Sequence, residues 1–110
     1  IEVPSLATVG SYTYEGNLKS PFTAHPKVDP VTGHMMFFGY SLAQPPYLKY
    51  SVVSPAGKLL QTVPIDLPVG VMMHDFAITE NYTIFMDLPL TFRLERMQRG
   101  EPAFMFEKDT

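Results

Sequence analysis

Two stretches of this sequence decide its fold, and they follow the same plan. Residues 21–40 read PFTAHPKVDPVTGHMMFFGY, and residues 72–87 read MMHDFAITENYTIFMD. Each stretch has an apolar run that contains one histidine, then a turn-forming segment, then a second apolar run. Short runs of Val, Ile, Tyr and Phe separated by Pro, Gly and Asp are typical of antiparallel strands joined by turns. The pattern predicts an all-β protein.

The expected strands fall into two units. In the first unit we expect strands at residues 21–25, 35–40, 47–53 and 58–65, with the Asp29-Pro30-Val31-Thr32-Gly33 segment as a turn. Aspartate bonds its own backbone, proline fixes φ and glycine supplies a positive φ in such a turn. In the second unit we expect strands at 72–78 and 82–87, one helical turn at 94–98 and an apolar stretch at 103–106.

The two units superimpose with an offset of 49 residues, which places His25 over His74. Repeats of about 40–50 residues that hold four short strands are typical of β-propeller blades, whose innermost strands line a central axis. We therefore expect blade-like units at about residues 21–66 and 71–110. Histidines at equivalent places on two innermost strands would both point at that axis. The repeat thus predicts one metal ion shared by His25 and His74.

Imidazole chemistry suits this interpretation. A neutral ring nitrogen binds Fe, Zn, Cu or Ni while the other nitrogen donates a hydrogen bond. Pro26 restricts His25 to an extended conformation and so fixes the direction of its ring. Taken singly, His25 also suits an ordinary strand end, and His74 also suits a core histidine bonded to a backbone carbonyl. The equivalence of the two positions favours the metal over both alternatives.

The other polar residues are expected to have ordinary roles. His34 follows Gly33 at a hairpin end, so we expect a surface residue. Asp75 adjoins His74, and neighbours on a strand point to opposite faces, so we expect Asp75 to bond backbone in an adjacent loop instead of sharing the ion. The remaining residues considered are expected in turns, at a strand end or on a solvated face: Glu80, Asn81, Asp87, Arg93, Glu95, Arg96 and Arg99.

Composition excludes several classes of function. The 110 residues include no cysteine, which removes disulfides, thiolate metal sites and cysteine nucleophiles. The formal net charge of −3 gives no basic footprint for nucleic acid. Motifs for nucleotide hydrolysis or acyl transfer are missing. Seven Met, eight Phe and six Tyr would either line a channel for a long hydrophobic substrate or pack between sheets, and we favour packing.

Four segments resemble one known family. Residues 23–33 and 72–81, quoted above, closely resemble the carotenoid cleavage dioxygenases, also called the carotenoid oxygenase family. Residues 46–50 (PYLKY) and 84–90 (IFMDLPL) are also similar to the family's pattern. The resemblance implies a seven-bladed β-propeller, of which this chain would be about two blades from a much longer protein. It also implies cleavage of a conjugated double bond in carotenoids or apocarotenoids with O2.

The resemblance further implies an identity for the metal. Family members hold a non-haem Fe(II) ion with four histidines and no carboxylate ligand, so His25 and His74 would be the first and second ligands in chain order. The other two histidines, and the glutamates that orient the rings in the family, have no counterpart in this sequence, and His34 lies in no matching motif. The segment alone is therefore expected to be inactive, and its open sheet edges are expected to make it fold poorly.

Several alternatives stay open at this stage. The family also contains members that cleave stilbene-type phenolics and a branch that isomerises retinyl esters. A metal-free propeller segment that serves as a binding module is a third alternative. The family's substrate is a small polyene, collected through a hydrophobic tunnel by an enzyme that rests on a membrane surface. The residues leave the compartment open, and the cytoplasm and the plastid both fit.

Overall fold

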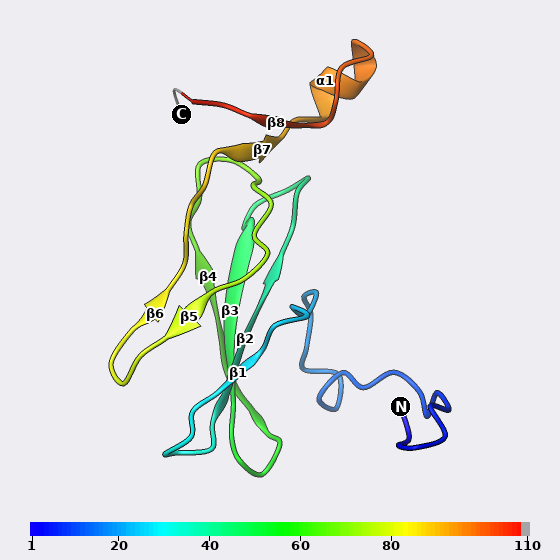
Figure 1. Ribbon diagram of the computed structural model, residues 1–110, viewed down its shortest axis with the longest axis vertical. Coiled ribbons are helices and arrows are strands. Elements are labelled where there is room, and N and C mark those ends of the chain that lie inside the picture. The colour runs from blue at the N-terminus through cyan, green and yellow to red at the C-terminus, as the bar shows by residue number, and fades with distance from the viewer. Residues whose placement is uncertain (109–110) are drawn as a thin grey trace.

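The structure is a computed structural model that describes residues 1–108, and it is nearly all β. Its centre is an antiparallel sheet in the order β1-β2-β3-β4 (Figure 1), formed by Lys27–Val28, Met35–Tyr40, Leu48–Val53 and Leu59–Ile65. Two ribbons follow: β5 (Ala77–Ile78) pairs with β6 (Thr83–Ile84), and β7 (Leu90–Phe92) pairs with β8 (Phe104–Phe106). The short helix α1 (Leu94–Gln98) joins β7 to β8. The expected all-β class is confirmed.

Most of the predicted elements form, but the two strands that were expected to carry the histidines do not form as predicted. The predicted strand at residues 21–25 is wrong: the Thr23 N–H donates to the Phe38 carbonyl, where the unbroken β1–β2 ladder would pair Phe38 with His25. Pro26 has no N–H to donate, so regular pairing starts only at Lys27. Likewise, of the strand expected at 72–78, only Ala77–Ile78 forms.

Two strands, β1 and β7, lie outside the predicted ones. β7 follows Pro89, and no element was predicted at residues 90–92. The structure pairs Leu90, Thr91 and Phe92 with Phe106, Met105 and Phe104. Thr91 also forms an isolated bridge with Val71, which ties the β7–β8 ribbon to the segment that carries His74.

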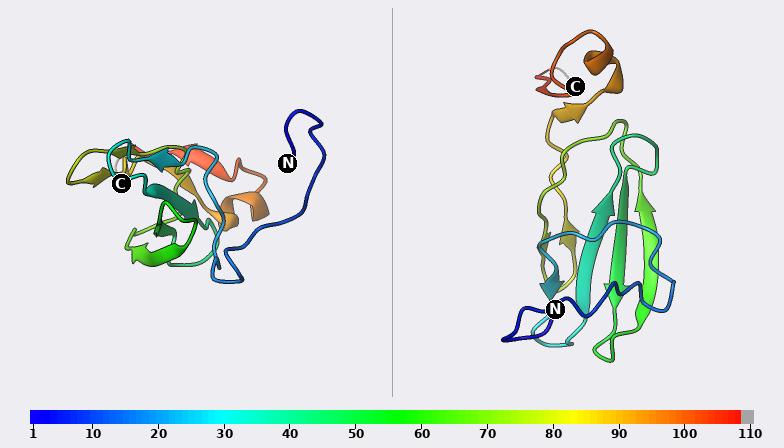
Figure 2. Two further views of the ribbon diagram at one scale, coloured as in Figure 1. Left: turned by 90° about the horizontal axis from the view of Figure 1, so that it is seen from below. Right: turned by 90° about the vertical axis from the view of Figure 1, so that its right-hand side faces the viewer.

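The hydrophobic core lies between the central sheet and the segment that leads into β5. Phe38 and Leu48 from the sheet are fully buried against Val71, Met73 and Phe76. The right-hand view of Figure 2 shows the β5–β6 ribbon alongside the β1–β4 sheet. Met73 packs in this core, as favoured for the methionines, whereas its neighbour Met72 is exposed. This packing fixes the chain on either side of His74.

The opposite face of the sheet is covered by the N-terminal segment. Phe37 is fully buried and stacks on Phe22 with ring centroids 4.0 Å apart. Tyr14 stacks on the same ring at 6.1 Å. Adjacent residues Phe37 and Phe38 therefore anchor one layer each, because successive strand residues point to opposite faces.

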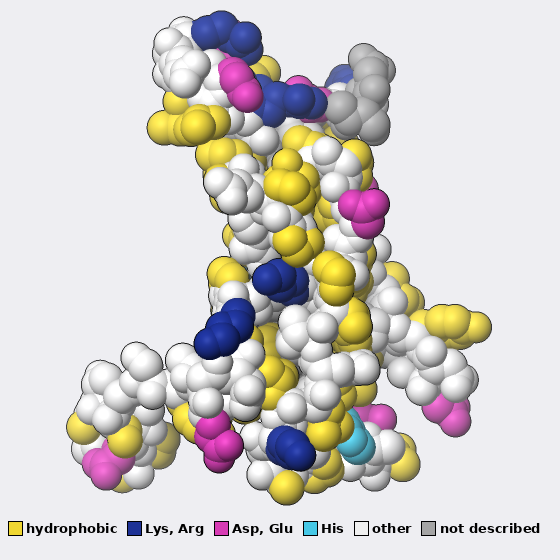
Figure 3. Space-filling model, turned by 180° about the vertical axis from the view of Figure 1, so that it is seen from behind, with side chains coloured by type: hydrophobic (Ala, Val, Ile, Leu, Met, Phe, Trp, Pro, Cys, Tyr) yellow, Lys and Arg dark blue, Asp and Glu magenta, His cyan; other side chains and the backbone are white. Residues whose placement is uncertain are grey.

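The described part of the chain is more extended than a compact domain. Its radius of gyration is 16.3 Å, against about 13 Å for a compact domain of this size. Apolar side chains are exposed at many places on the face drawn in Figure 3. The exposed apolar residues include Val28, Val31, Ile84, Met86 and Leu88. Among residues 1–108, no helix has both the length and the apolar character that crossing a membrane requires.

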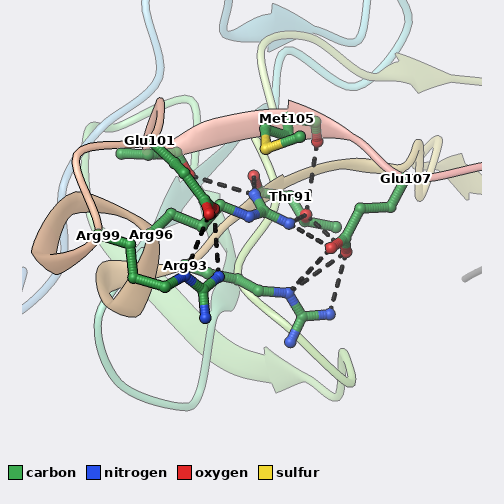
Figure 4. Close-up of polar contacts among 8 residues, drawn as sticks. Thr91, Arg93, Arg96, Arg99, Glu101, Met105 and Glu107 are labelled. Carbon is green, nitrogen blue, oxygen red and sulfur yellow. Dashed lines mark hydrogen bonds and ion pairs between the residues drawn. The ribbon is translucent and has the colours of Figure 1, made fainter.

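A polar network fastens α1 to the β7–β8 ribbon (Figure 4). Arg96, expected on a solvated face, is instead buried, and it donates to the Thr91 carbonyl, the Thr91 hydroxyl and the Glu107 carboxylate. The expectation was wrong because the short helix turns this residue inward, under β8. Arg93 donates to the same carboxylate from the exposed side at 3.0 Å. Arg93, Glu95 and Arg99 are exposed, as expected.

The Glu107 carboxylate is the acceptor that this network shares. Hydrogen bonds from Arg93 and then from Thr91 lower the pKa of Glu107 from 4.5 to about 2. A carboxyl whose pKa is lower in the folded state stabilises the protein fully above its unfolded pKa, and the contribution is lost as pH falls through the folded pKa.

This shift leads to a stability prediction. We expect Glu107→Gln to lower the stability of the full-length protein at pH 7, because Gln offers two arginines no charge. The difference from wild type should shrink as pH falls from about 4.5 to about 2, where Glu107 itself becomes neutral. Urea denaturation midpoints measured over this range check the effect. Glu80→Gln, at an exposed turn residue, is the control. A loss of stability in Glu107→Gln that is the same at every pH would contradict the prediction.

Candidate metal centre

The structure brings His25 and His74 together. Their Nε2 atoms are 3.0 Å apart, and the ring centroids are 4.7 Å apart with the planes inclined by 61°. Neither residue lies in a strand: His25 precedes β1 by two residues, and His74 precedes β5 by three. The expectation that both lie on strands was therefore wrong, although each still stands just before a strand of its own unit.

This geometry fits a shared metal ion. Imidazole nitrogens lie about 2.0–2.1 Å from a bound first-row metal such as zinc, so two that bind one ion at a right angle are about 3.0 Å apart. The same separation also suits an N–H···N hydrogen bond between two neutral rings. A shared metal ion requires that neither of the facing Nε2 atoms carries a proton, whereas the hydrogen bond requires that one of them donates and the other accepts.

His25 is positioned by a close backbone crossing. Its N–H donates to the Thr23 hydroxyl at 3.1 Å, and the Thr23 backbone is bonded to β2. Just before it, Pro21 crosses Gly39 so closely that a Cβ on Gly39 would lie 2.0 Å from the Pro21 carbonyl oxygen. Only glycine leaves room for this crossing, so Gly39 determines where the His25 segment runs. The sequence analysis missed Gly39, whose only signal was a glycine within an apolar strand.

His74 is positioned by its buried neighbours. Met73 and Phe76 point into the core, and Phe76 stacks on Phe85 with ring centroids 5.4 Å apart. Between them, His74 and Asp75 face outward and are exposed. His74 is therefore not a core histidine, and its ring stands at the margin of the core within reach of His25.

Asp75 bonds backbone, as expected, and also has a partner that was not expected. Its Oδ1 accepts the N–H of Phe76, a neighbouring residue outside the strands, and forms a 2.8 Å ion pair with the Lys27 ammonium. The ion pair was missed because residues 72–76 are not in a strand, so the Asp75 side chain can turn toward Lys27. Hydrogen bonding from Lys27, and then from the Phe76 N–H, lowers the pKa of the Asp75 carboxyl.

The described residues place no third donor of the usual kind together with the pair. Within residues 1–108, no cluster of three or more His, Asp or Glu side chains is placed to hold a metal ion. His34 is half-buried, and its backbone closes the turn that starts at Asp29. Two histidines thus form the whole candidate centre in the described part of the chain.

Comparison with known proteins places the chain in a family. The family model described as RPE65, retinal pigment epithelial membrane protein, matches residues 1–110. The chain is 53% identical to a carotenoid 9,10(9',10')-cleavage dioxygenase of Crocus sativus over 100 residues, which are 91% of this chain and 18% of that protein. It is 41% identical to resveratrol cleavage oxygenase 1 of Aspergillus fumigatus over 109 residues, which are 96% of this chain and 22% of that protein.

A solved structure is similar as well. The crystal structure of a Pseudomonas brassicacearum lignostilbene dioxygenase superimposes with a TM-score of 0.81 at 44% sequence identity, covering 94% of this chain and 22% of that one. The chain therefore belongs to the carotenoid oxygenase family. It spans about a fifth of the length of these relatives.

The Gly39 crossing supplies a test of how the centre is positioned. We expect Gly39→Ala in the full-length protein to displace Pro21, and with it His25, since the added Cβ would overlap a backbone oxygen. Metal content after purification should fall, as measured by plasma emission spectrometry. Gly57→Ala is the matched control, because Gly57 has a positive φ of 82° but open space around it. It should lower the melting temperature and leave metal content unchanged. Equal metal content in Gly39→Ala and wild type would contradict this account.

Proposed function

We propose that this chain belongs to an Fe(II)-dependent dioxygenase in which His25 and His74 are two of the metal ligands. The observation that carries the proposal is the 3.0 Å separation of the two Nε2 atoms, from segments 49 residues apart in the sequence. A histidine–histidine hydrogen bond would satisfy the same distance. The metal is favoured because His74 is exposed and His25 is only half-buried, so water can satisfy either histidine without such a pairing.

The residues present fit Fe(II) by their chemistry. Neutral imidazoles suit iron, and they leave its positive charge uncompensated. When bound, Fe(II) would supply the binding and activation of O2 beside an electron-rich double bond. The role of this chain is to hold two uncharged nitrogens at one point. The remaining ligands would come from other parts of the longer protein, as would the walls of the substrate cavity.

We propose a carotenoid or apocarotenoid as the substrate. The support is the higher identity to the Crocus carotenoid cleavage dioxygenase, 53%, than to the resveratrol-cleaving oxygenase, 41%, or the lignostilbene dioxygenase, 44%. These three relatives are a carotenoid cleavage dioxygenase, a resveratrol cleavage oxygenase and a lignostilbene dioxygenase, all enzymes of small unsaturated molecules. A stilbene is therefore the main alternative substrate.

We also propose that the β1–β4 sheet is one propeller blade and that the later strands belong to a neighbouring one. The units at about 21–66 and 71–110 correspond to this division. The support is the exposed apolar surface of β6 and of the chain after it, which is the surface that an adjoining blade would bury. On this proposal the 110 residues alone would not be an active enzyme.

The ligand assignment is tested by alanine variants of the full-length protein. We expect His25→Ala and His74→Ala each to lose most of the iron and all measurable cleavage, because removing a ligand from a histidine site leaves too few donors. His34→Ala is the matched control, since His34 lies outside the pair, and it should keep both. Iron is measured by a colorimetric chelator assay. Full iron content in both single variants would refute the assignment.

The substrate is tested by product identification. The full-length enzyme is incubated under O2 with an apocarotenoid and, separately, with resveratrol, and aldehyde products are identified by mass spectrometry. We expect aldehydes from the polyene and little or none from the stilbene. The reverse preference would contradict the carotenoid proposal while leaving double-bond cleavage intact.

A further inference from the structure

One ion pair joins the two histidine segments. Lys27 follows His25 by two residues, and Asp75 follows His74 directly. The Lys27 Nζ lies 2.8 Å from the Asp75 Oδ1, with the two side chains 30% and 47% exposed. The same ammonium lies 5.6 Å from the centre of the Phe76 ring. Lys27 therefore contacts two consecutive residues of the other segment.

Apart from the contact of the two rings, the Lys27–Asp75 ion pair is the polar contact between the segments that lies nearest in sequence to both histidines. Thr23 bonds within the His25 segment and to Phe38 of β2, not to the His74 segment. The aromatic core contacts of Phe76 lie on the other side of the His74 segment from solvent. Backbone packing brings the segments near each other, but an exposed histidine retains freedom of rotation about its side-chain bonds. A link one or two residues from each ring restricts how far the backbones on either side separate.

Asp75 is held by two donors on one oxygen. Its Oδ1 accepts both the Lys27 ammonium and the Phe76 N–H, at 2.8 Å each. The carboxylate is thus directed to the Lys27 side and is engaged there. An ion pair in which one partner is also fixed by its backbone loses less conformational freedom on forming than a pair of free side chains does.

We propose that the Lys27–Asp75 ion pair is a positioning device that sets the separation of the His25 and His74 Nε2 atoms, and thereby the affinity of the centre for Fe(II). Lys27 and Asp75 are positioning residues: neither binds the metal. This inference rests on the proposed function, since it concerns the same centre, but it adds two residues that act on the centre through the segments that carry the ligands.

The test uses the full-length enzyme with Fe(II) alone and with Co(II) as a spectroscopic probe. The variants are Lys27→Met and Asp75→Asn, which remove one charge each, and Lys27→Arg, which keeps the charge and the donor. We expect each charge-removing variant to raise the Fe(II) dissociation constant about fivefold, the size of effect that one partly exposed ion pair supports. Lys27→Arg should restore affinity close to wild type. The visible bands of the Co(II) enzyme should shift in the first two variants and return in the third.

A double variant isolates the pair. If Lys27 and Asp75 act only through each other, Lys27→Met/Asp75→Asn should be no weaker in Fe(II) affinity than either single variant. The matched control is Arg99→Met, which removes an exposed ion pair with Glu101 at 3.1 Å. Helix α1, just before Arg99, lies at the far end of the molecule from β1 (Figure 1). Arg99→Met should leave Fe(II) affinity and Co(II) bands unchanged.

The outcomes separate this inference from the proposed function. If His25→Ala and His74→Ala lose iron while Lys27→Met and Asp75→Asn behave like Arg99→Met, the positioning role is wrong and the ligand assignment stands. A lowered melting temperature with unchanged Co(II) bands would show a purely structural ion pair and would also overturn it. Tighter iron binding in Lys27→Met would mean that a released Asp75 carboxylate joins the metal, which is equally incompatible. Retention of iron in both histidine variants would instead remove the proposed function itself.

Discussion

The arrangement depends on one packing interaction: Phe38 of the central sheet meets Phe76 and Phe85 of the following unit, with ring centroids 5.3 and 5.6 Å apart. Burying a large apolar side chain contributes roughly 1.5–3 kcal/mol, and an aromatic pair adds about 0.5–1.5 kcal/mol. A partly exposed ion pair contributes about 0.2–1 kcal/mol. The aromatic cluster therefore holds the two units together. The ion pair between Lys27 and Asp75 affects only how the edges of the two units are aligned near the histidines.

The two histidines come together because this core packing positions the segments that carry them. The core takes up Met73 and Phe76 and leaves His74 between them on the outside. On the sheet side, the Gly39 crossing and Pro26 end the regular β1–β2 ladder. His25 is therefore not paired in the sheet, and its ring lies next to that of His74. A functional centre at an interruption of regular structure is common, because residues in an unbroken ladder have their direction fixed by the pleat.

Much of this was predictable from the sequence. Alternating apolar runs and turn residues predicted β2, β3, β4 and α1 nearly to the residue, since local propensity and pattern agree there. The repeat predicted the meeting of His25 and His74, which the structure shows. What failed depends on long-range geometry: the inward turn of Arg96, the partner of Asp75 and the strand after Pro89. The charges just after the two histidines were a visible signal for the Lys27–Asp75 pair, but opposite charges in separate segments specify a contact only once the fold is known.

The central claim is that two imidazoles from successive units share one iron ion. Its most direct test is anomalous X-ray diffraction at the iron edge on crystals of the full-length protein. The account predicts one strong peak about 2.1 Å from the Nε2 atoms of both His25 and His74, the distance usual for an imidazole on a first-row metal. A peak that contacts only one of the two rings, or two rings that hydrogen-bond to each other while iron binds elsewhere, would contradict it.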